Sequence, residues 1–371
     1  MFFVSSSALA AEPVIFAVNV ALTGIENAGD RGIVAGAKLA AKIINAQGGL
    51  RGRPLELLFV DNYGTDIGAR NAASMILKTR AVAMIGAGRS SRSLVAAEVA
   101  QQGGMPMVTP YSTHPDITKT GNQIFRIGFN DEFQGKALGE FAARSLKLKH
   151  AIILENVSEE YSSILANHFT QSYERNGGRV VWRGHYRRTT IDFSSLLKAV
   201  KEHSFDIIFI PGYTKRSAWL IRQARKMGIK AQFLGGDGWG ASMFEYGGEA
   251  IEGQLSTDHW HRDVDTPFST KFLEAYHLEY GQQKIMSTGT VLTYDAVNLL
   301  AAVVRSAAGE GRKAVQKGLQ GVRGFQGGTG EITFDQFGDP KNKDIVFTRF
   351  ENGQKSLVGV FKCCAVNEVD N

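Results

Sequence analysis

Short apolar segments alternate with segments of helical periodicity along most of the chain, and this alternation limits the possible folds more than any other feature. Residues 14–22 form a β-rich apolar run, and residues 31–47 place apolar side chains at helical spacing before the stop signal Gly48-Gly49. The same alternation continues to residue 110 and begins again after residue 130. Strands and helices that alternate in this way form βαβ units with a parallel sheet. The sequence therefore predicts an α/β protein.

The alternation occurs in two runs, and 371 residues are enough for two domains of ordinary size. No low-complexity linker separates the runs, which favours two lobes hinged closely together. The predicted strands are 14–22, 54–62, 82–87, 106–110, 151–156, 179–186, 206–210, 232–234, 330–335, 344–350 and 356–361, and the predicted helices are 31–47, 66–79, 90–102, 132–147, 161–176, 192–203, 215–228, 266–282 and 290–308.

Composition and charge exclude several classes of protein. Hydrophobic residues make up 43% of the chain and charged residues 21%, which is ordinary for a globular protein. The formal net charge is +6, but the basic residues are spread along the chain, with only short clusters at Arg187-Arg188 and from Arg222 to Lys226. We therefore predict no nucleic-acid partner.

The two ends of the chain carry separate signals. Residues 1–13, MFFVSSSALAAEP, resemble the end of a secretory signal, with an apolar remnant before the cleavage-site pattern Ala8-Leu9-Ala10. The basic leader is missing, so the match is either a truncated signal or accidental; we predict a signal remnant and an exported chain. Cys363 and Cys364 are too few for a disulfide framework or a zinc site, and we assign residues 362–371 to a tail.

Hydrogen-bonding side chains gather at four places where a predicted strand ends. In open α/β sheets, ligands bind beyond the carboxyl ends of the strands. The four segments are GAGRSS (86–91), PYSTHP (110–115), PGYTK (211–215) and GGDGWG (235–240). These segments are therefore the candidate ligand-binding site.

The first two segments contain the groups expected to bind an anion. Ser90 begins a predicted helix, where its hydroxyl either caps the helix or helps to bind an anion at the positive end of the helix dipole. Tyr111, Ser112 and Thr113 follow the next strand, and an ordinary Ser/Thr turn is the alternative explanation. If the two loops are adjacent, their hydroxyl and N–H groups converge on one carboxylate, and each such hydrogen bond contributes roughly 1.5–3 kcal/mol.

The second run supplies the opposite charge. Asp237 lies between glycines, so its carboxylate has little steric obstruction and suits a cationic amine; the alternative is a turn-forming Asp-Gly. Tyr161 and Tyr213 are either core or rim aromatic residues. Trp239 either forms the wall of a side-chain pocket or simply packs inside the lobe.

The chain also resembles a known family in several segments: INAQGGLRGRPLEL (44–57), MPMVTPYSTHPDIT (105–118), FDIIFIPGY (205–213) and RQARKMGIKAQFLGGDG (222–238). They resemble the leucine/isoleucine/valine-binding proteins, the amino-acid receptors of ABC transporters, which have the type I periplasmic binding protein fold. The resemblance extends from about Val14 to about Phe361. It implies two Rossmann-like lobes with parallel central sheets joined by a hinge, an N-terminal lobe of residues 14–129 plus 262–341 and a C-terminal lobe of residues 130–261 plus 342–361.

The resemblance also implies roles for individual residues. The side chains of Ser90 and Thr113 would bind the α-carboxylate of an amino acid, and the Tyr111 carbonyl and the Thr113 side chain would contact its ammonium. Ser112 would add a backbone donor, and Asp237 would pair with the ammonium where the best-known members have Glu. Tyr161 and Tyr213 would come from the closing lobe. Tyr111 and Trp239 replace smaller residues, which permits an aromatic or otherwise different ligand.

The expected function is that of a periplasmic, monomeric substrate-binding protein that delivers a free amino acid to the membrane permease of an ABC transporter, with no cofactor and no catalytic residue. An enzyme is the first alternative, but the sequence has no G-x-S-x-G, H-E-x-x-H, P-loop or complete dinucleotide motif. His259 and His261 are expected at the surface and not at a metal site, because no third ligand accompanies them. The second alternative is a sensor of the same fold that binds an amide, urea or an aromatic acid.

Overall fold

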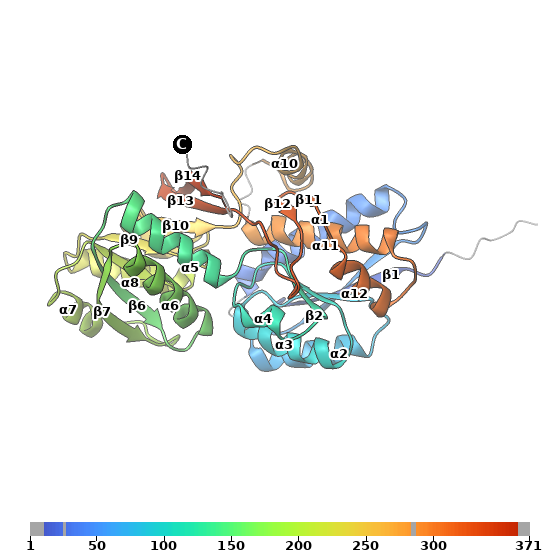
Figure 1. Cartoon of the computed structure of the whole chain (residues 1–371), viewed down its shortest axis with the longest axis horizontal. Coiled ribbons are helices and arrows are strands. Elements are labelled where there is room, and N and C mark those ends of the chain that lie inside the picture. Colours follow the sequence, from blue (N-terminus) through green and yellow to red (C-terminus); the bar gives the residue numbers. More distant parts are fainter. Residues whose placement is uncertain (1–10, 25–26, 283–286, 363–371) are drawn as a thin grey trace, which may run out of the picture.

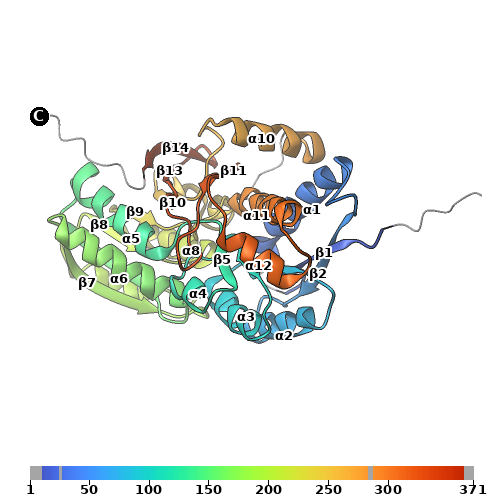
Figure 2. The ribbon, with the colours of Figure 1, turned by 45° about the vertical axis from the view of Figure 1, so that its right-hand side comes forward.

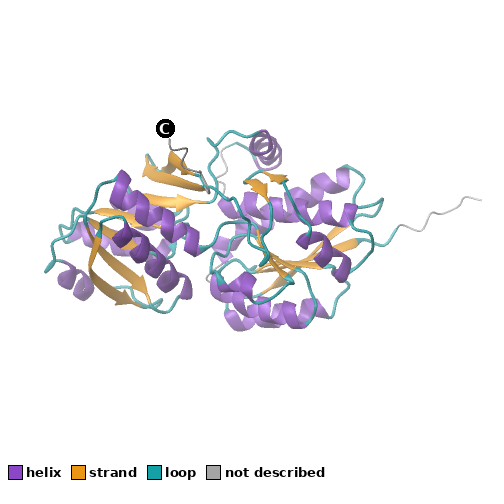
Figure 3. Cartoon of the chain, in the orientation of Figure 1, coloured by secondary structure: helices purple, strands orange, loops and turns teal. Residues whose placement is uncertain are grey.

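The computed structural model describes residues 11–24, 27–282 and 287–362, and it contains two lobes that lie side by side (Figure 1). Each lobe is built around one sheet with helices on both faces, and Figure 3 shows the sheets in orange between purple helices. The predicted α/β fold with two lobes is therefore confirmed, with one difference at the edge of the second sheet.

The N-terminal lobe contains a five-stranded sheet in which every neighbouring pair of strands is parallel. In sheet order the strands are β2 (Leu55–Asp61), β1 (Val14–Val20), β3 (Ala83–Gly86), β4 (Met107–Thr109) and β5 (Ile124–Arg126). β1 reads VIFAVNV and is buried along nearly its whole length, as expected of a parallel strand that has helices on both faces.

Helices cover both faces of this sheet because successive side chains of a strand point in opposite directions. Phe16 and Val18 pack on one set of helices, α1 (Asn27–Ala46), α11 (Thr288–Ser306) and α12 (Arg312–Gln320). Ala17 packs on the other set, α2 (Asp66–Leu77), α3 (Ser90–Gln102) and α4 (Asp116–Lys119). Figures 1 and 2 both show the two sets on opposite sides of the sheet. The lobe is completed by α10 (Pro267–Tyr280) and the small hairpin of β11 (Phe325–Gly327) and β12 (Gly330–Ile332).

The C-terminal lobe contains a seven-stranded sheet. In sheet order the strands are β14 (Gln354–Phe361), β13 (Ile345–Glu351), β10 (Leu255–Asp258), β9 (Gln232–Gly235), β8 (Ile207–Ile210), β6 (His150–Asn156) and β7 (Arg179–Tyr186). The pairs from β10 to β7 are parallel, whereas β13 is antiparallel to both β10 and β14. This edge departs from the expected parallel sheet because β13 and β14 are joined by a tight turn and not by a helix.

Two glycines let the helices on one face of this sheet approach closely. The face is covered by α5 (Asp131–Glu140), which continues as a π-helix over Phe141–Ser145, and by α6 (Glu160–Arg175). A Cβ atom on Gly135 would lie 2.7 Å from the backbone nitrogen of Phe169, and one on Gly139 would lie 2.5 Å from that of Tyr173. The opposite face is covered by α7 (Ser194–Val200), α8 (Thr214–Lys226), α9 (Met243–Gly247) and a 3-10 turn over Gly248–Ile251.

The chain passes between the two sheets after β5, after β10 and after β12. At the first of these crossings, Asn130 caps α5 by accepting the Phe133 N–H at 3.0 Å and donates to Asp339, in the third crossing, at 3.0 Å. The carboxyl ends of β3 and β4 in one lobe and of β9 in the other adjoin these crossings. The fold therefore brings the four predicted strand ends toward the boundary between the lobes.

Candidate ligand-binding site

The first predicted group lies at the carboxyl ends of β3 and β4, which are neighbours in the sheet. Ser90 is the first residue of α3, and its hydroxyl oxygen accepts a hydrogen bond from the backbone N–H of His114 at 3.3 Å. The carbonyl oxygen of Thr113 accepts a hydrogen bond from the Asp131 N–H at 2.8 Å. The loop after β4 therefore lies beside Ser90, where two hydroxyls can serve one ligand.

Ser112 and Arg126 hold this loop in position. The hydroxyl of Ser112 lies 2.7 Å from that of Ser93 inside the lobe. The buried guanidinium of Arg126 donates to the carbonyl oxygens of Ser112 at 2.7 Å and His114 at 2.9 Å, and it pairs with Asp339 at 2.7 Å. Arg126 was not predicted as a site residue, because only its place at the end of β5 distinguishes it from a surface arginine.

The second predicted group surrounds Asp237, which follows β9. One carboxylate oxygen accepts hydrogen bonds from the Gln134 amide and the Tyr161 hydroxyl, each at 2.9 Å, and the other lies 3.2 Å from Nε2 of His259. The ring of Tyr161 stacks on that of Tyr213, with their centroids 5.0 Å apart. Asp237 is therefore held in one orientation by groups from α5, α6 and the second crossing.

The electrostatics of this group act in opposite directions on its two carboxyl groups. Burial alone would raise the pKa of Asp237, but the hydrogen bond and charge of His259, with the bonds from Gln134 and Tyr161, lower it below its usual value. Burial and then the nearby Asp237 raise the pKa of Asp131 well above its usual value. Burial and Asp237 also raise the pKa of Tyr161, so this phenol stays a hydrogen-bond donor. Ionisation is therefore favoured at Asp237 and disfavoured at Asp131.

Tyr111 brings the two groups together across the boundary between the lobes. Its hydroxyl donates to the backbone carbonyl oxygen of Asp237 at 2.9 Å, and its ring centroid lies 5.6 Å from that of His259. Ser90, Thr113 and Asp237 are each only 2–3% exposed, so the lobes are in contact at this place. The Tyr111 contact would therefore have to separate before these buried residues could meet a ligand.

Trp239 stands apart from the other seven predicted residues. It is fully buried in the core of the C-terminal lobe, where its ring contacts Gly235 closely and lies 6.2 Å from that of Phe350. A side chain on Gly235 would occupy the same space as this indole. Of the two alternatives for Trp239, the structure therefore supports packing inside the lobe.

His259 is buried, so the expectation that it lies at the surface is wrong. It follows β10, is 4% exposed, and stacks on Phe129 with the ring centroids 3.7 Å apart. Gly128 makes room for this ring, since a Cβ atom there would lie 2.6 Å from it. His261 is also buried, and its Nε2 lies 3.1 Å from the carbonyl oxygen of Lys355. The strand-end rule would have found His259, because it directly follows a strand.

Arg89 is a further residue that the sequence did not identify. Its guanidinium lies over the ring of Tyr213 with its carbon 3.9 Å from the ring centroid, and it pairs with Glu159 at 3.5 Å. Both partners belong to the opposite lobe. In the sequence, a basic residue directly before a predicted helix gave no local signal for contacts of this kind.

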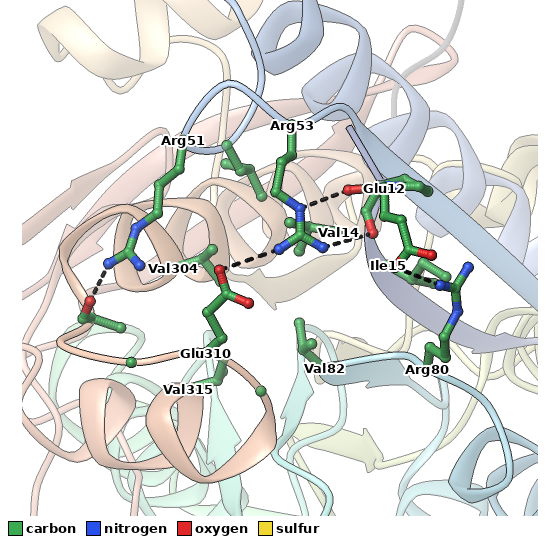
Figure 4. Close-up of a pocket in the computed structure, with 15 residues that line it drawn as sticks. Glu12, Val14, Ile15, Arg51, Arg53, Arg80, Val82, Val304, Glu310 and Val315 are labelled. Atoms are coloured by element: carbon green, nitrogen blue, oxygen red, sulfur yellow. Dashed lines mark hydrogen bonds and ion pairs between the residues drawn. The ribbon is translucent and has the colours of Figure 1, made fainter. Parts of the chain in front are cut away.

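A separate cavity of about 330 Å³ opens at the far end of the N-terminal lobe (Figure 4). Arg53 donates to the carbonyl oxygen of Glu12 at 2.6 Å and pairs with Glu310 at 3.4 Å, and Arg80 pairs with Glu12 at 2.8 Å. The cavity lies at the amino end of β1, whose first residue Val14 contributes to the lining. Because ligands of open α/β sheets bind at the opposite ends of the strands, this cavity is not the candidate site.

The described residues lack two features that other protein classes require. No cluster of three or more His, Cys, Asp or Glu side chains suited to a metal ion occurs among residues 11–24, 27–282 and 287–362. Within the same ranges, none of the helices combines the length and apolar character needed to span a membrane. The predicted signal remnant, apart from residues 11–13, and the Cys363-Cys364 pair lie outside the described residues.

Comparisons with known proteins identify the family of the chain. Residues 13–355 match the family described as periplasmic binding protein. A leucine-binding protein from Thermotoga maritima, LivK, is 32% identical, with a TM-score of 0.88 over 94% of this chain and 98% of that chain. The substrate-binding protein LivJ of a branched-chain amino acid transporter from Streptococcus pneumoniae, solved with isoleucine, is 25% identical, with a TM-score of 0.87 over 95% and 99% of the two chains.

A curated relative gives the same result from sequence alone. The leucine-, isoleucine-, valine-, threonine- and alanine-binding protein of Pseudomonas aeruginosa is 28% identical over 319 residues, which are 85% of this chain and 84% of that protein. The match covers both lobes and all four strand-end segments. The chain therefore belongs to the periplasmic binding protein family, among the binding proteins for branched-chain amino acids that serve ABC transporters.

Proposed function

We propose that this protein is the extracytoplasmic solute-binding component of an ABC transporter, and that it captures a free amino acid between its lobes and delivers it to the membrane permease. The observation that carries the proposal is the pairing of opposite chemistry across the lobe boundary. Hydroxyl groups at the start of α3 and after β4 lie on one side, and the ionised Asp237 lies on the other. An α-amino acid presents the complementary charges at a fixed separation.

On the side of the N-terminal lobe, Ser90 and Thr113 would bind the α-carboxylate. Their hydroxyls lie near the amino end of α3, where free N–H groups and the helix dipole favour an anion. Tyr111 would border the same pocket, since its ring already lies between this loop and Asp237. The backbone of Ser112 would contribute from the same loop.

On the side of the C-terminal lobe, Asp237 would pair with the ammonium of the ligand, and Tyr161 and Tyr213 would close over it. Three donors already fix the Asp237 carboxylate, which leaves one of its four acceptor positions for the ligand. A carboxylate that is already oriented loses little freedom on binding, which favours affinity. Binding involves no chemical step, and we expect the ligand to be released unchanged.

One observation favours a second class of ligand. Because most acceptor positions of Asp237 are taken by the protein itself, an aromatic acid without an ammonium group would also satisfy the site. Such a ligand would use the hydroxyls of Ser90 and Thr113 and the aromatic surface of Tyr111 and Tyr213. The proteins similar to this chain bind leucine and isoleucine, which supports the amino acid as the first candidate.

A binding screen tests the proposal. We expect one or more of the twenty amino acids to raise the melting temperature of the purified chain, with urea, simple amides and aromatic acids as the comparison set. Titration calorimetry should then give one site per chain, and chromatography of the released ligand should show it unchanged. Stabilisation by aromatic acids alone would favour the second class, and no stabilisation by any carboxylate would contradict both.

A further inference from the structure

Arg89 projects from the N-terminal lobe at the point where the lobes meet. It is the residue before α3, with an extended backbone (φ −115°, ψ 155°), between Gly88 and Ser90. Gly88 has φ +89°, and a Cβ atom there would lie 2.6 Å from a carboxylate oxygen of Asp30, so only glycine fits. Asp30 is itself fixed by Arg92 through a buried ion pair at 3.0 Å. The base of Arg89 is therefore anchored to its own lobe.

Its guanidinium makes two contacts with the opposite lobe. The charged carbon lies 3.9 Å from the centroid of the Tyr213 ring, and an N–H nitrogen lies 3.5 Å from a carboxylate oxygen of Glu159. The side chain of Glu159 is 4% exposed and that of Arg89 is 22% exposed. A cation–π contact and an ion pair that are shielded from water are stronger than the same contacts at the surface.

These contacts are connected to the candidate site but lie beside it. Tyr213 stacks on Tyr161, whose hydroxyl donates to Asp237. Both partners of Arg89 precede helices of the C-terminal lobe, Glu159 before α6 and Tyr213 before α8. When the hinge opens, these helices move away from α3, so both contacts exist only in the closed form.

We propose that Arg89 fastens the closed form of the two lobes through Glu159 and Tyr213, and so sets how long any bound ligand is retained. The part of this inference that concerns ligand retention rests on the proposed function. The contacts of Arg89 between the lobes do not, because they form without a ligand. A contact made in one of two states shifts their ratio by its full differential strength. The closed form should therefore lose population when Arg89 is removed, and dissociation should accelerate by the same factor for every ligand.

The structure offers a matched control for this effect. Glu159 also pairs with Arg188 at 3.0 Å, and both residues belong to the C-terminal lobe. The pair is therefore present in the open and the closed form. Arg188→Gln should leave the open–closed ratio nearly unchanged, whereas Arg89→Ala should shift it toward the open form.

The first experiment needs no ligand. Spin labels at Ile67→Cys and Ile191→Cys, both exposed and in different lobes, report the distance between the lobes once Cys363 and Cys364 are replaced by serine. We expect Arg89→Ala and the isosteric Glu159→Gln each to lower the closed-to-open ratio at least fivefold. The double variant should match Arg89→Ala, because that change already removes the ion pair with Glu159. Unfolding in urea checks that each variant is folded.

The second experiment measures dissociation of leucine, and of any other amino acid that binds, by stopped-flow fluorescence. Arg89→Ala should raise the dissociation rate of every ligand by the same factor, at least fivefold. The rate for Arg89→Lys should lie between those of Arg89→Ala and the unmodified chain, because lysine keeps the charge but lacks the planar guanidinium group. If leucine and all other carboxylates fail to bind, the proposed function is wrong while the label distances still test Arg89. Identical distance distributions for the unmodified chain and Arg89→Ala, with and without saturating ligand, would overturn the inference. So would an effect confined to ligands with acidic side chains, since that would make Arg89 a direct ligand contact.

Discussion

Replacement of Asp237 gives the sharpest test of how the site is built. Asp237→Ala removes the acceptor of three buried donors, those of Gln134, Tyr161 and His259. Each buried donor left without a partner costs about 1–3 kcal/mol. Because neighbouring groups relax, we expect the free energy of unfolding to fall by about 3–5 kcal/mol. The same variant should lose amino-acid binding.

Asp237→Asn separates the two effects. The amide oxygen can still accept from Gln134 and Tyr161, but the amide nitrogen faces Nε2 of His259. The imidazole must then carry its proton on Nδ1, which is buried and has no hydrogen-bond partner in the described part of the chain. We expect a loss of stability of about 1–3 kcal/mol, the cost of one unpaired buried donor. Without the negative charge, amino-acid affinity should fall about 100-fold, or about 2.7 kcal/mol.

Urea unfolding followed by circular dichroism measures the stability, and titration calorimetry measures the affinity. Asp192→Asn is the control, because this carboxylate lies on the surface of the same lobe and accepts hydrogen bonds from the N–H and hydroxyl of Ser194. It should behave like the unmodified chain in both assays. An unchanged urea midpoint for Asp237→Ala would refute the buried network, and undiminished leucine affinity in Asp237→Asn would refute its role toward an ammonium.

Three more changes test other parts of the structure. The double variant Ser90→Ala with Thr113→Ala should lower the affinity for every ligand that has an α-carboxylate about 100-fold in calorimetry. A loss limited to ligands with one class of side chain would contradict the role of these hydroxyls in binding the carboxylate. Arg126→Gln should lower the free energy of unfolding by about 3–5 kcal/mol, because half-buried Asp339 and two carbonyl oxygens lose the fully buried guanidinium; an unchanged urea midpoint would contradict this. Burial lowers the pKa of Lys343 from 10.5 to about 8, so between these values the unfolded state binds more protons and stability rises with pH. Lys343→Met should remove about 1–3 kcal/mol of that rise in urea titrations at pH 8 and pH 10; a rise of equal size in both chains would contradict the assignment.

Much of the fold follows from periodicity and glycine positions. The predicted helix 90–102 coincides with α3, and the predicted strand 14–22 exceeds β1 by two residues because Ala21 and Leu22 already belong to the loop. Elements with weak patterns were not predicted: β5 has three residues, and α12 lies between glycine-rich segments. The antiparallel pairing of β13 could not be predicted either, because a strand pattern does not state the direction of its neighbour.

Part of the site could be predicted from local sequence patterns, whereas the rest depends on tertiary packing. The rule that ligands bind beyond strand ends located Ser90, Thr113 and Asp237, since each follows a strand. Gln134 could not be found in this way, because it lies within a helix and reaches Asp237 only through the packing of α5. The burial of Trp239 also depends on packing, through Gly235 and Phe350.

The crossings between the lobes and the candidate site share residues, and we propose that this couples ligand binding to closure. His259 holds Asp237 and begins the second crossing, and it stacks on Phe129 of the first crossing. Gln134, in the first helix after that crossing, binds the other oxygen of Asp237. The carboxylate therefore moves with the crossings, while Thr113 moves with the opposite sheet. A ligand that needs both ends bound has high affinity only for the closed form, and it shifts the equilibrium by that difference in affinity.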